Sequence, residues 1–155
     1  MSRNLYRAQF ADPPSRGLKD ETFHYSFDSS NVAALGAAIA AGAVLNDVIL
    51  QLQPDYEFAC RGFKVQFGVA ASRLNLWLKD AFGNYLSQVP VPLALYATGS
   101  GAGVCGSLIV PFEPEIICPA SGFFTVYLYN PTAAPLNPPA FSLFGVKRCP
   151  LEAAA

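Results

Sequence analysis

Charged residues are scarce in this chain. They make up 14% of its 155 residues, whereas a soluble domain usually carries about 25%. Hydrophobic residues make up 52%, and the mean hydropathy is +0.30. So little charge covers the surface of a monomer poorly, and we therefore expect a permanent interface, in the first place between copies of the chain. The net charge of −1 lacks the basic excess that phosphate binding needs, so we expect no nucleic-acid partner.

Long apolar runs are also missing. The longest run extends from Val32 to Leu45 and is interrupted by Gly36 and Gly42. It is shorter than the ~20 residues that a membrane helix needs. Residues 1–7 lack the apolar core of a signal peptide. We therefore expect no membrane span, no membrane partner and no secretion signal.

Metal-binding and disulfide patterns are absent from the sequence. The four cysteines, Cys60, Cys105, Cys118 and Cys149, contain no C-x-x-C spacing, and the single histidine, His24, leaves no Cys/His zinc pattern. Cys60 and Cys118 lie in strand-like segments, where a free thiol packs as a small apolar side chain. We expect reduced structural cysteines in preference to disulfides, and no metal or cofactor.

Candidate catalytic residues are few. A Ser-His-Asp or Cys-His site would need His24, the single histidine. His24 lies in the predicted arm, whereas a catalytic base must be held rigidly within hydrogen-bond reach of the nucleophile. Glu113 and Glu115 flank Pro114 and could be read as a glycosidase pair, which needs carboxylates ~5–10 Å apart across a sugar. No aromatic cleft or third group supports them. We expect no catalytic residues and no enzymatic activity.

The chain does contain many turn residues and short alternating segments. Its 13 prolines and 12 glycines indicate turns between short strands. The clearest alternation sets three apolar residues against a threonine and two tyrosines: Phe124, Val126 and Leu128 against Thr125, Tyr127 and Tyr129. This period of two is typical of a strand with one buried face. Seven or eight such strands predict an all-β fold, an antiparallel β-sandwich of jelly-roll type.

The sequence divides into three parts. Residues 1–31 are polar with scattered aromatic residues and predict an extended N-terminal arm, which includes a short strand where Phe23, Tyr25 and Phe27 alternate with polar residues. Residues 32–148 predict the β-sandwich domain, and residues 149–155 a C-terminal tail. The turn at residues 119–122 is expected to use Gly122 for a positive φ.

Four segments follow one another in a characteristic order. They are Asp55-Tyr56-Glu57-Phe58, the hairpin at residues 76–87, Cys118-Pro119-Ala120-Ser121-Gly122, and Phe144-Gly145-Val146-Lys147-Arg148. Together they resemble small β-sandwich structural proteins that decorate or cement the capsids of tailed bacteriophages. The resemblance covers residues 22–148.

That resemblance implies a non-enzymatic virion component. It would be made in the cytoplasm of a bacterial host and would bind the major capsid protein on the capsid surface as a homo-oligomer, which we expect to be a trimer. A position in the neck, tail or fibre is one alternative, because related sandwiches occur there. A carbohydrate-binding β-sandwich is an alternative of another class.

Aromatic residues outside the expected core are the candidate partner contacts. They are Tyr6 and Phe10 in the arm, and Trp77, Tyr127 and Tyr129 on the polar faces of strands. One interpretation is cross-strand packing within a sheet or between subunits. The other is contact with a capsid lattice or a glycan, because Tyr and Trp are enriched at interfaces.

Overall fold

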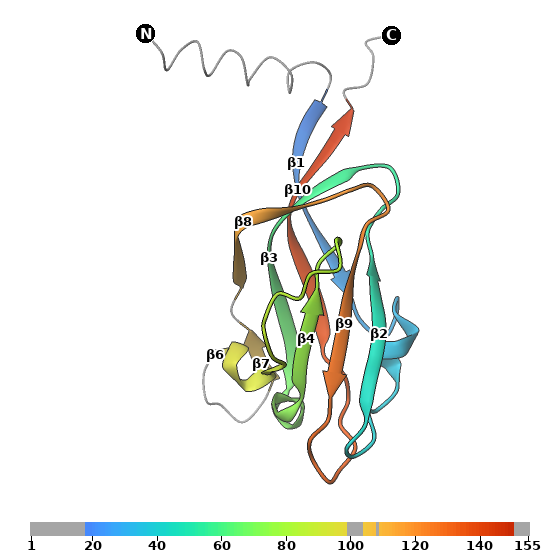
Figure 1. The fold of residues 1–155 in the computed structure, drawn as a ribbon, viewed down its shortest axis with the longest axis vertical. Helices are drawn as coiled ribbons and strands as arrows, with labels where there is room; N and C mark the ends of the chain where they lie inside the picture. The colour runs from blue at the N-terminus through green and yellow to red at the C-terminus, as the bar shows by residue number, and fades with distance from the viewer. Residues whose placement is uncertain (1–17, 99–103, 108, 151–155) are drawn as a thin grey trace.

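The computed structural model describes residues 18–98, 104–107 and 109–150, which form an antiparallel β-sandwich (Figure 1). The strands of these ranges are β1 (Leu18–Phe27), β2 (Val44–Gln51), β3 (Glu57–Gly68), β4 (Asn75–Lys79), β5 (Val91–Pro92), β6 (Ala97–Thr98), β7 (Val104–Ser107), β8 (Val110–Cys118), β9 (Phe123–Tyr129) and β10 (Ala140–Pro150). Three short 3-10 helices accompany them: η1 (Ala33–Gly36), η2 (Val69–Arg73) and η3 (Leu93–Tyr96). No helix in the described ranges has the length and apolar character needed to cross a membrane.

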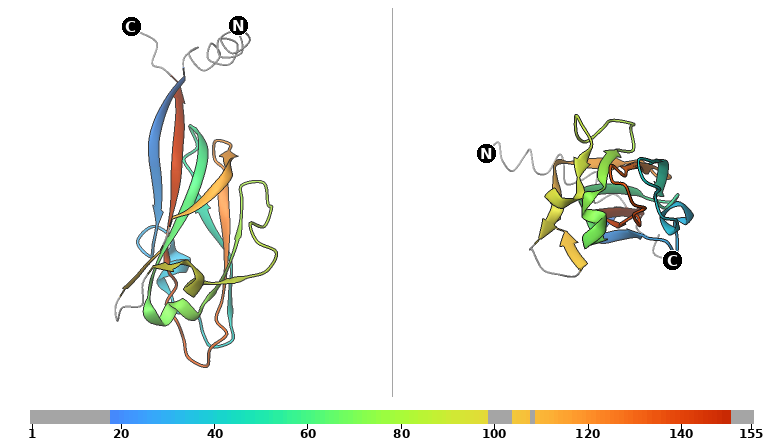
Figure 2. Two further views of the ribbon diagram at one scale, coloured as in Figure 1. Left: turned by 90° about the vertical axis from the view of Figure 1, so that its left-hand side faces the viewer. Right: turned by 90° about the horizontal axis from the view of Figure 1, so that it is seen from below.

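The strands pair as a long hairpin rolled up on itself. β1 pairs with β10, β2 with β9, β3 with β8 and β4 with β5, each antiparallel. This nested pairing is the topology of a jelly roll. It places β1, β10, β3 and β8, with the short β7 and β6, in the larger sheet, and β2, β9, β4 and β5 in the smaller one. The two sheets face each other across the core (Figure 2). The predicted all-β, jelly-roll-like sandwich is confirmed.

The core lies between the sheets and follows from the alternation within the strands. In β9, Phe124, Val126 and Leu128 are fully buried. In β4, Leu76 and Leu78 are buried while the residues between and beside them are half-exposed. Successive side chains of a strand point to opposite faces, so the same period that buries these residues turns their neighbours outward.

The larger sheet contains a bulge at Arg61. Phe144 and Gly145 of β10 lie opposite Gly62 and Cys60 of β3, so Arg61 is an extra residue in its strand. A Cβ atom on Gly145 would overlap a backbone carbonyl oxygen of β3, and only glycine fits there. The change of phase that the sequence shows near residues 61 and 62 is therefore a β-bulge.

The turn at residues 119–122 forms as expected, but a different residue takes the positive φ. Gly122 N donates a hydrogen bond to Pro119 O at 2.9 Å. Ser121 has the left-handed conformation, with φ of 60°. Glycine is needed at position 122 for space, because a Cβ atom there would lie 2.8 Å from Pro119 O.

The expected boundary between arm and sandwich at residue 31 is corrected by β1. This strand pairs along its whole length with β10 and forms the edge of the larger sheet. Its residues Tyr25 and Phe27 are buried, and the Tyr25 ring meets Phe58 edge-on at 5.0 Å. Residues 18–27 therefore belong to the sandwich, because their backbone pairs with β10 and two of their side chains are part of the core. At the other end β10 continues to Pro150, two residues into the expected tail.

Shortening the N-terminus should distinguish assembly from folding. We expect deletion of residues 2–17 to leave the thermal melt of the sandwich nearly unchanged, because β1 begins at Leu18, and to weaken oligomer formation. Deletion of residues 2–27 should lower the melting temperature sharply, since it removes β1 from the core. Calorimetry and sedimentation of both variants provide the measurement. Equal loss of the melt in both would place residues 2–17 in the folded unit.

The expected reduced cysteines are found where side chains are described. Cys60, Cys118 and Cys149 are free thiols, while Cys105 belongs to a stretch whose side chains lie outside the described ones. Cys60 and Cys118 are buried, and desolvation raises the pKa of each thiol from 9.0 to about 12. Both thiols therefore stay protonated at neutral pH in the folded protein, and the reactive thiolate form is scarce.

Alkylation of the native protein at pH 8, followed by peptide mass analysis, checks this. We expect Cys149, which is half-exposed, to react rapidly, and Cys60 and Cys118 to react only after unfolding. Between pH 9 and about 12 the unfolded chain loses thiol protons that the folded chain keeps, so these two groups should make stability fall as pH rises. Rapid labelling of Cys60 in the native state would contradict their burial.

Candidate contact face

The outer face of the smaller sheet carries four rings that are exposed or half-exposed, and we call it the aromatic face. Its rings come from β4, β9 and the segment after β4: Trp77, Tyr85, Tyr127 and Tyr129. The strand register places Trp77 opposite Tyr127 and Asn75 opposite Tyr129. Tyr129 also lies opposite Val44 of β2. Cross-strand neighbours on one face are close enough for their rings to meet.

Trp77 is held in place by two contacts with the segment that follows its strand. Its ring stacks on Tyr85 with centroids 3.9 Å apart and planes inclined by 18°. Its Nε1 donates a hydrogen bond to Ser87 O at 2.9 Å. The hairpin at residues 80–84 returns the chain for these contacts, because the Asp80 carboxylate accepts hydrogen bonds from the backbone N of Phe82 and Asn84. The indole is thereby fixed and still half-exposed.

Tyr127 links the rings to the charges on this face. Its hydroxyl donates a hydrogen bond to Asp47 Oδ1 at 2.7 Å, and this bond is the main cause of the raised pKa of Tyr127. The Lys79 ammonium lies 4.5 Å from the centroid of Tyr85 and 5.4 Å from that of Tyr127. Both charges are therefore engaged within the face, through a hydrogen bond and through cation–π contacts.

A shallow groove of about 410 Å³ runs over these rings. Its lining combines the four aromatic side chains with two aliphatic residues and two amides: Trp77, Tyr85, Tyr127, Tyr129, Val44, Pro90, Asn46 and Asn75. Ring faces and amides offer stacking and hydrogen bonds without net charge. The groove can bind a neutral partner; the groups that line it include no nucleophile or general base.

The two outer faces of the sandwich differ in character. On the smaller sheet, Val44, Ile49 and Tyr129 are 48%, 41% and 39% exposed. On β1 and β3 of the larger sheet the exposed outward side chains are polar: Thr22, His24, Ser26, Arg61 and Gln66. Exposed apolar area on one face of a protein with little charge marks that face as an interaction surface.

Three of the expected contact residues meet on this face. Trp77, Tyr127 and Tyr129 lie together on it, whereas Tyr6 and Phe10 lie outside the described residues. Tyr85 is the functional residue that sequence reasoning missed. The hairpin signal at residues 80–84 could have found it, because a chain that turns back beside β4 must place its next residues along that strand.

The candidate catalytic groups lie outside the groove, His24 on β1 and Glu113 and Glu115 on β8. His24 is exposed on β1 and stacks on Phe144 at 5.9 Å. Glu115 pairs with Arg61 at 3.1 Å, and Glu113 is exposed. Among the residues that the structure describes, no three His, Cys, Asp or Glu side chains are grouped so that they could hold a metal ion.

Comparisons with models of protein families, with curated proteins and with solved structures found no match to this chain.

Proposed function

We propose that this chain is a non-enzymatic binding module that docks on a partner through the aromatic face. The observation that carries the proposal is the exposure of rings and aliphatic side chains on the outer face of the smaller sheet, whereas β1 and β3 of the larger sheet expose polar side chains. Rigid aromatic side chains contribute large contact area at low entropic cost, and Tyr and Trp are enriched at the centres of interfaces. Trp77 and Tyr127 are already held by intramolecular contacts, which limits the cost of ordering them on binding.

We further propose that the module is a capsid decoration protein of a bacteriophage, assembled in the host cytoplasm, with the major capsid protein as partner. Two observations support this setting. One is the resemblance of residues 22–148 to such proteins. The other is the jelly-roll topology, which recurs in viral capsid proteins, and that support is an analogy of fold.

The low charge leads us to expect a stable homo-oligomer, a trimer by analogy with proteins that occupy the three-fold positions of a capsid lattice. Sedimentation equilibrium at micromolar concentration measures it directly. A single species of three times 16.5 kDa is the expected result. A monomer over the whole concentration range would contradict self-association.

Binding to capsid shells that lack this protein tests the proposed partner. Tyr129→Ala removes an exposed ring and should reduce co-sedimentation at least tenfold if the ring lies near the centre of the contact. Phe144→Ala removes a half-buried ring from the outer side of the larger sheet, and it is the matched control that should bind like the parent. Equal binding by both variants would place the contact elsewhere.

A carbohydrate partner is the second candidate, and the composition of the groove favours it. Asn46 and Asn75 line the same groove as the four rings, so a sugar could stack on a ring while its hydroxyl groups bind the amides. Jelly rolls also occur as lectin domains. A glycan array probed with the parent and with Tyr129→Ala separates the two: saturable binding that the substitution removes supports a lectin, and an empty array supports the protein partner.

A further inference from the structure

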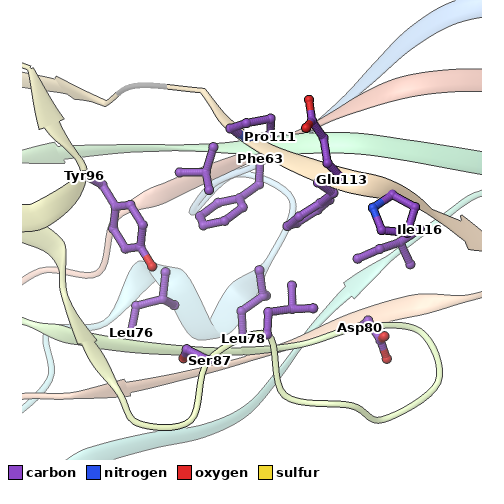
Figure 3. A pocket seen from close by; sticks show the side chains of 13 residues that line it. Phe63, Leu76, Leu78, Asp80, Ser87, Tyr96, Pro111, Glu113 and Ile116 are labelled. Carbon is purple, nitrogen blue, oxygen red and sulfur yellow. The ribbon is translucent and has the colours of Figure 1, made fainter.

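A second cavity lies on the opposite side of β4, between the two sheets. This pocket of about 380 Å³ is bounded by β3, β4, β8, η3 and the segment after β4 (Figure 3). Its wall includes three rings and three aliphatic side chains: Phe63, Tyr96, Phe112, Leu76, Leu78 and Ile116. Leu76 and Leu78 face this pocket while Trp77, between them, faces the groove, so the two sites use opposite faces of one strand.

The pocket exists because β8 does not follow β3 continuously. Ile116 lies opposite Cys60, and Pro111 lies opposite Gly62. Between these two pairs β8 contains residues 112–115, whereas β3 contains only Arg61. Such an excess of residues interrupts a ladder and redirects side chains. Phe112, inside this interruption, stacks on Phe63 at 5.6 Å and contributes to the wall.

The Tyr96 side chain brings a hydroxyl to the wall of the pocket. The hydroxyl of Tyr96 points toward Leu76 (Figure 3), and within the described part of the chain it has no hydrogen-bond partner. The Tyr96 ring is fixed by edge-on packing against Phe63 at 5.5 Å. Burial raises the pKa of Tyr96, so the hydroxyl is protonated at neutral pH and can donate one hydrogen bond.

The two carboxylates that line the pocket, those of Asp80 and Glu113, do not point into its interior (Figure 3). Asp80 accepts hydrogen bonds at 2.9 Å from two backbone N atoms of its own loop. Glu113 is exposed, and its carboxylate points away from Leu76 and Leu78 (Figure 3). The wall therefore combines rings and aliphatic side chains with polar atoms, Ser87 and the Tyr96 hydroxyl among them, and this lining favours a neutral ligand over a charged one.

We propose that this pocket binds a small neutral aromatic molecule, of the size of two fused rings, that carries one hydrogen-bond acceptor for the Tyr96 hydroxyl. A cavity of about 150 Å³ is enough for one benzene ring, so the volume suits two. Rings and aliphatic side chains together with a few placed polar groups are the usual lining of a small-molecule site. The site is independent of the aromatic face and of the function proposed for it.

Titration with 2-naphthol and with naphthalene, followed by the NMR signals of leucine and isoleucine methyl groups, tests the site. Both probes should shift the methyl signals of Leu76, Leu78 and Ile116 saturably. The Tyr96→Phe variant should bind 2-naphthol about 3- to 10-fold more weakly and naphthalene equally well, because it loses one hydrogen bond and keeps the ring. Ile116→Trp, which fills the pocket from its half-exposed wall, should abolish both shifts.

Tyr85→Phe, which removes a hydroxyl beside the groove, is the matched control and should bind both probes like the parent. Thermal melts establish that each variant is folded, and Leu86→Trp, at the rim of the pocket, replaces Ile116→Trp if that variant is not. The proposal is overturned if neither probe saturates at millimolar concentration, if the blocked variant binds as tightly as the parent, or if Tyr96→Phe treats both probes alike.

Discussion

Replacing Leu128 with alanine is expected to lower the free energy of unfolding by about 2–5 kcal/mol. Leu128 is 0% exposed and lies between Leu45 of β2 and Leu76 of β4 in the centre of the smaller sheet. The substitution removes buried methyl groups and leaves a cavity that the neighbouring strands cannot fill completely. Denaturant melts of the parent and the variant measure the difference.

Tyr127→Ala, one residue earlier in the same strand, should behave in the opposite way. Its side chain is half-exposed, and the substitution removes one hydrogen bond to Asp47, so the isolated fold should lose about 1 kcal/mol. Its cost should instead appear in association, where a central aromatic anchor is worth ~2 kcal/mol or more. If Tyr127→Ala unfolds the subunit as severely as Leu128→Ala, both faces of β9 are buried within one chain, and the aromatic face is not a contact surface.

The second large effect is expected at Asn130, which joins two loops at the end of β9. Its side chain is 0% exposed, and Nδ2 donates hydrogen bonds to the carbonyl oxygens of Ile39, Ala40 and Ala134 at 2.8–3.2 Å. Its Oδ1 accepts from Thr132 N and Oγ1. Asn130→Asp replaces the donor by a carboxylate oxygen facing three carbonyls, and we expect a loss of more than about 3 kcal/mol at pH 7.

The pH dependence of that variant identifies the cause. A buried carboxyl among carbonyl oxygens should have a raised pKa, and its protonated form can donate one hydrogen bond again. The folded state then binds a proton that the unfolded state has lost, so the deficit of Asn130→Asp against the parent should shrink as pH falls from 7 toward 4. Asn84→Ala is the matched control: Asn84 is exposed and its amide makes one hydrogen bond, at 3.3 Å, so a loss below about 1 kcal/mol is expected. A deficit that is constant with pH would show that the hydrogen-bond donor is not what position 130 requires.

Alternation along the strands carried most of the fold prediction. It placed Leu76, Val126 and Leu128 in the core and turned Trp77 and Tyr127 outward, because strand geometry leaves only two faces to choose from. Turn residues located the hairpin at residues 80–84, because the conformations that they favour depend only on their immediate neighbours in the sequence.

What the sequence could not supply depends on pairing between distant segments. Phe23, Tyr25 and Phe27 alternate, but only their pairing with β10 shows that they belong to the sandwich and not to an arm. The hairpin at residues 80–84 indicates where Tyr85 runs, but no periodic signal shows that its ring stacks on Trp77.

Trp77 offers the most direct test of the contact face, because it is the single tryptophan of the chain and lies half-exposed within that face. Acrylamide quenching of its fluorescence can be measured on the monomer, on the homo-oligomer and on protein bound to capsid shells. If the aromatic face is the contact surface, assembly should reduce the quenching constant several-fold and shift the emission to the blue. Unchanged quenching and emission in a sample that sedimentation shows to be assembled would contradict the account.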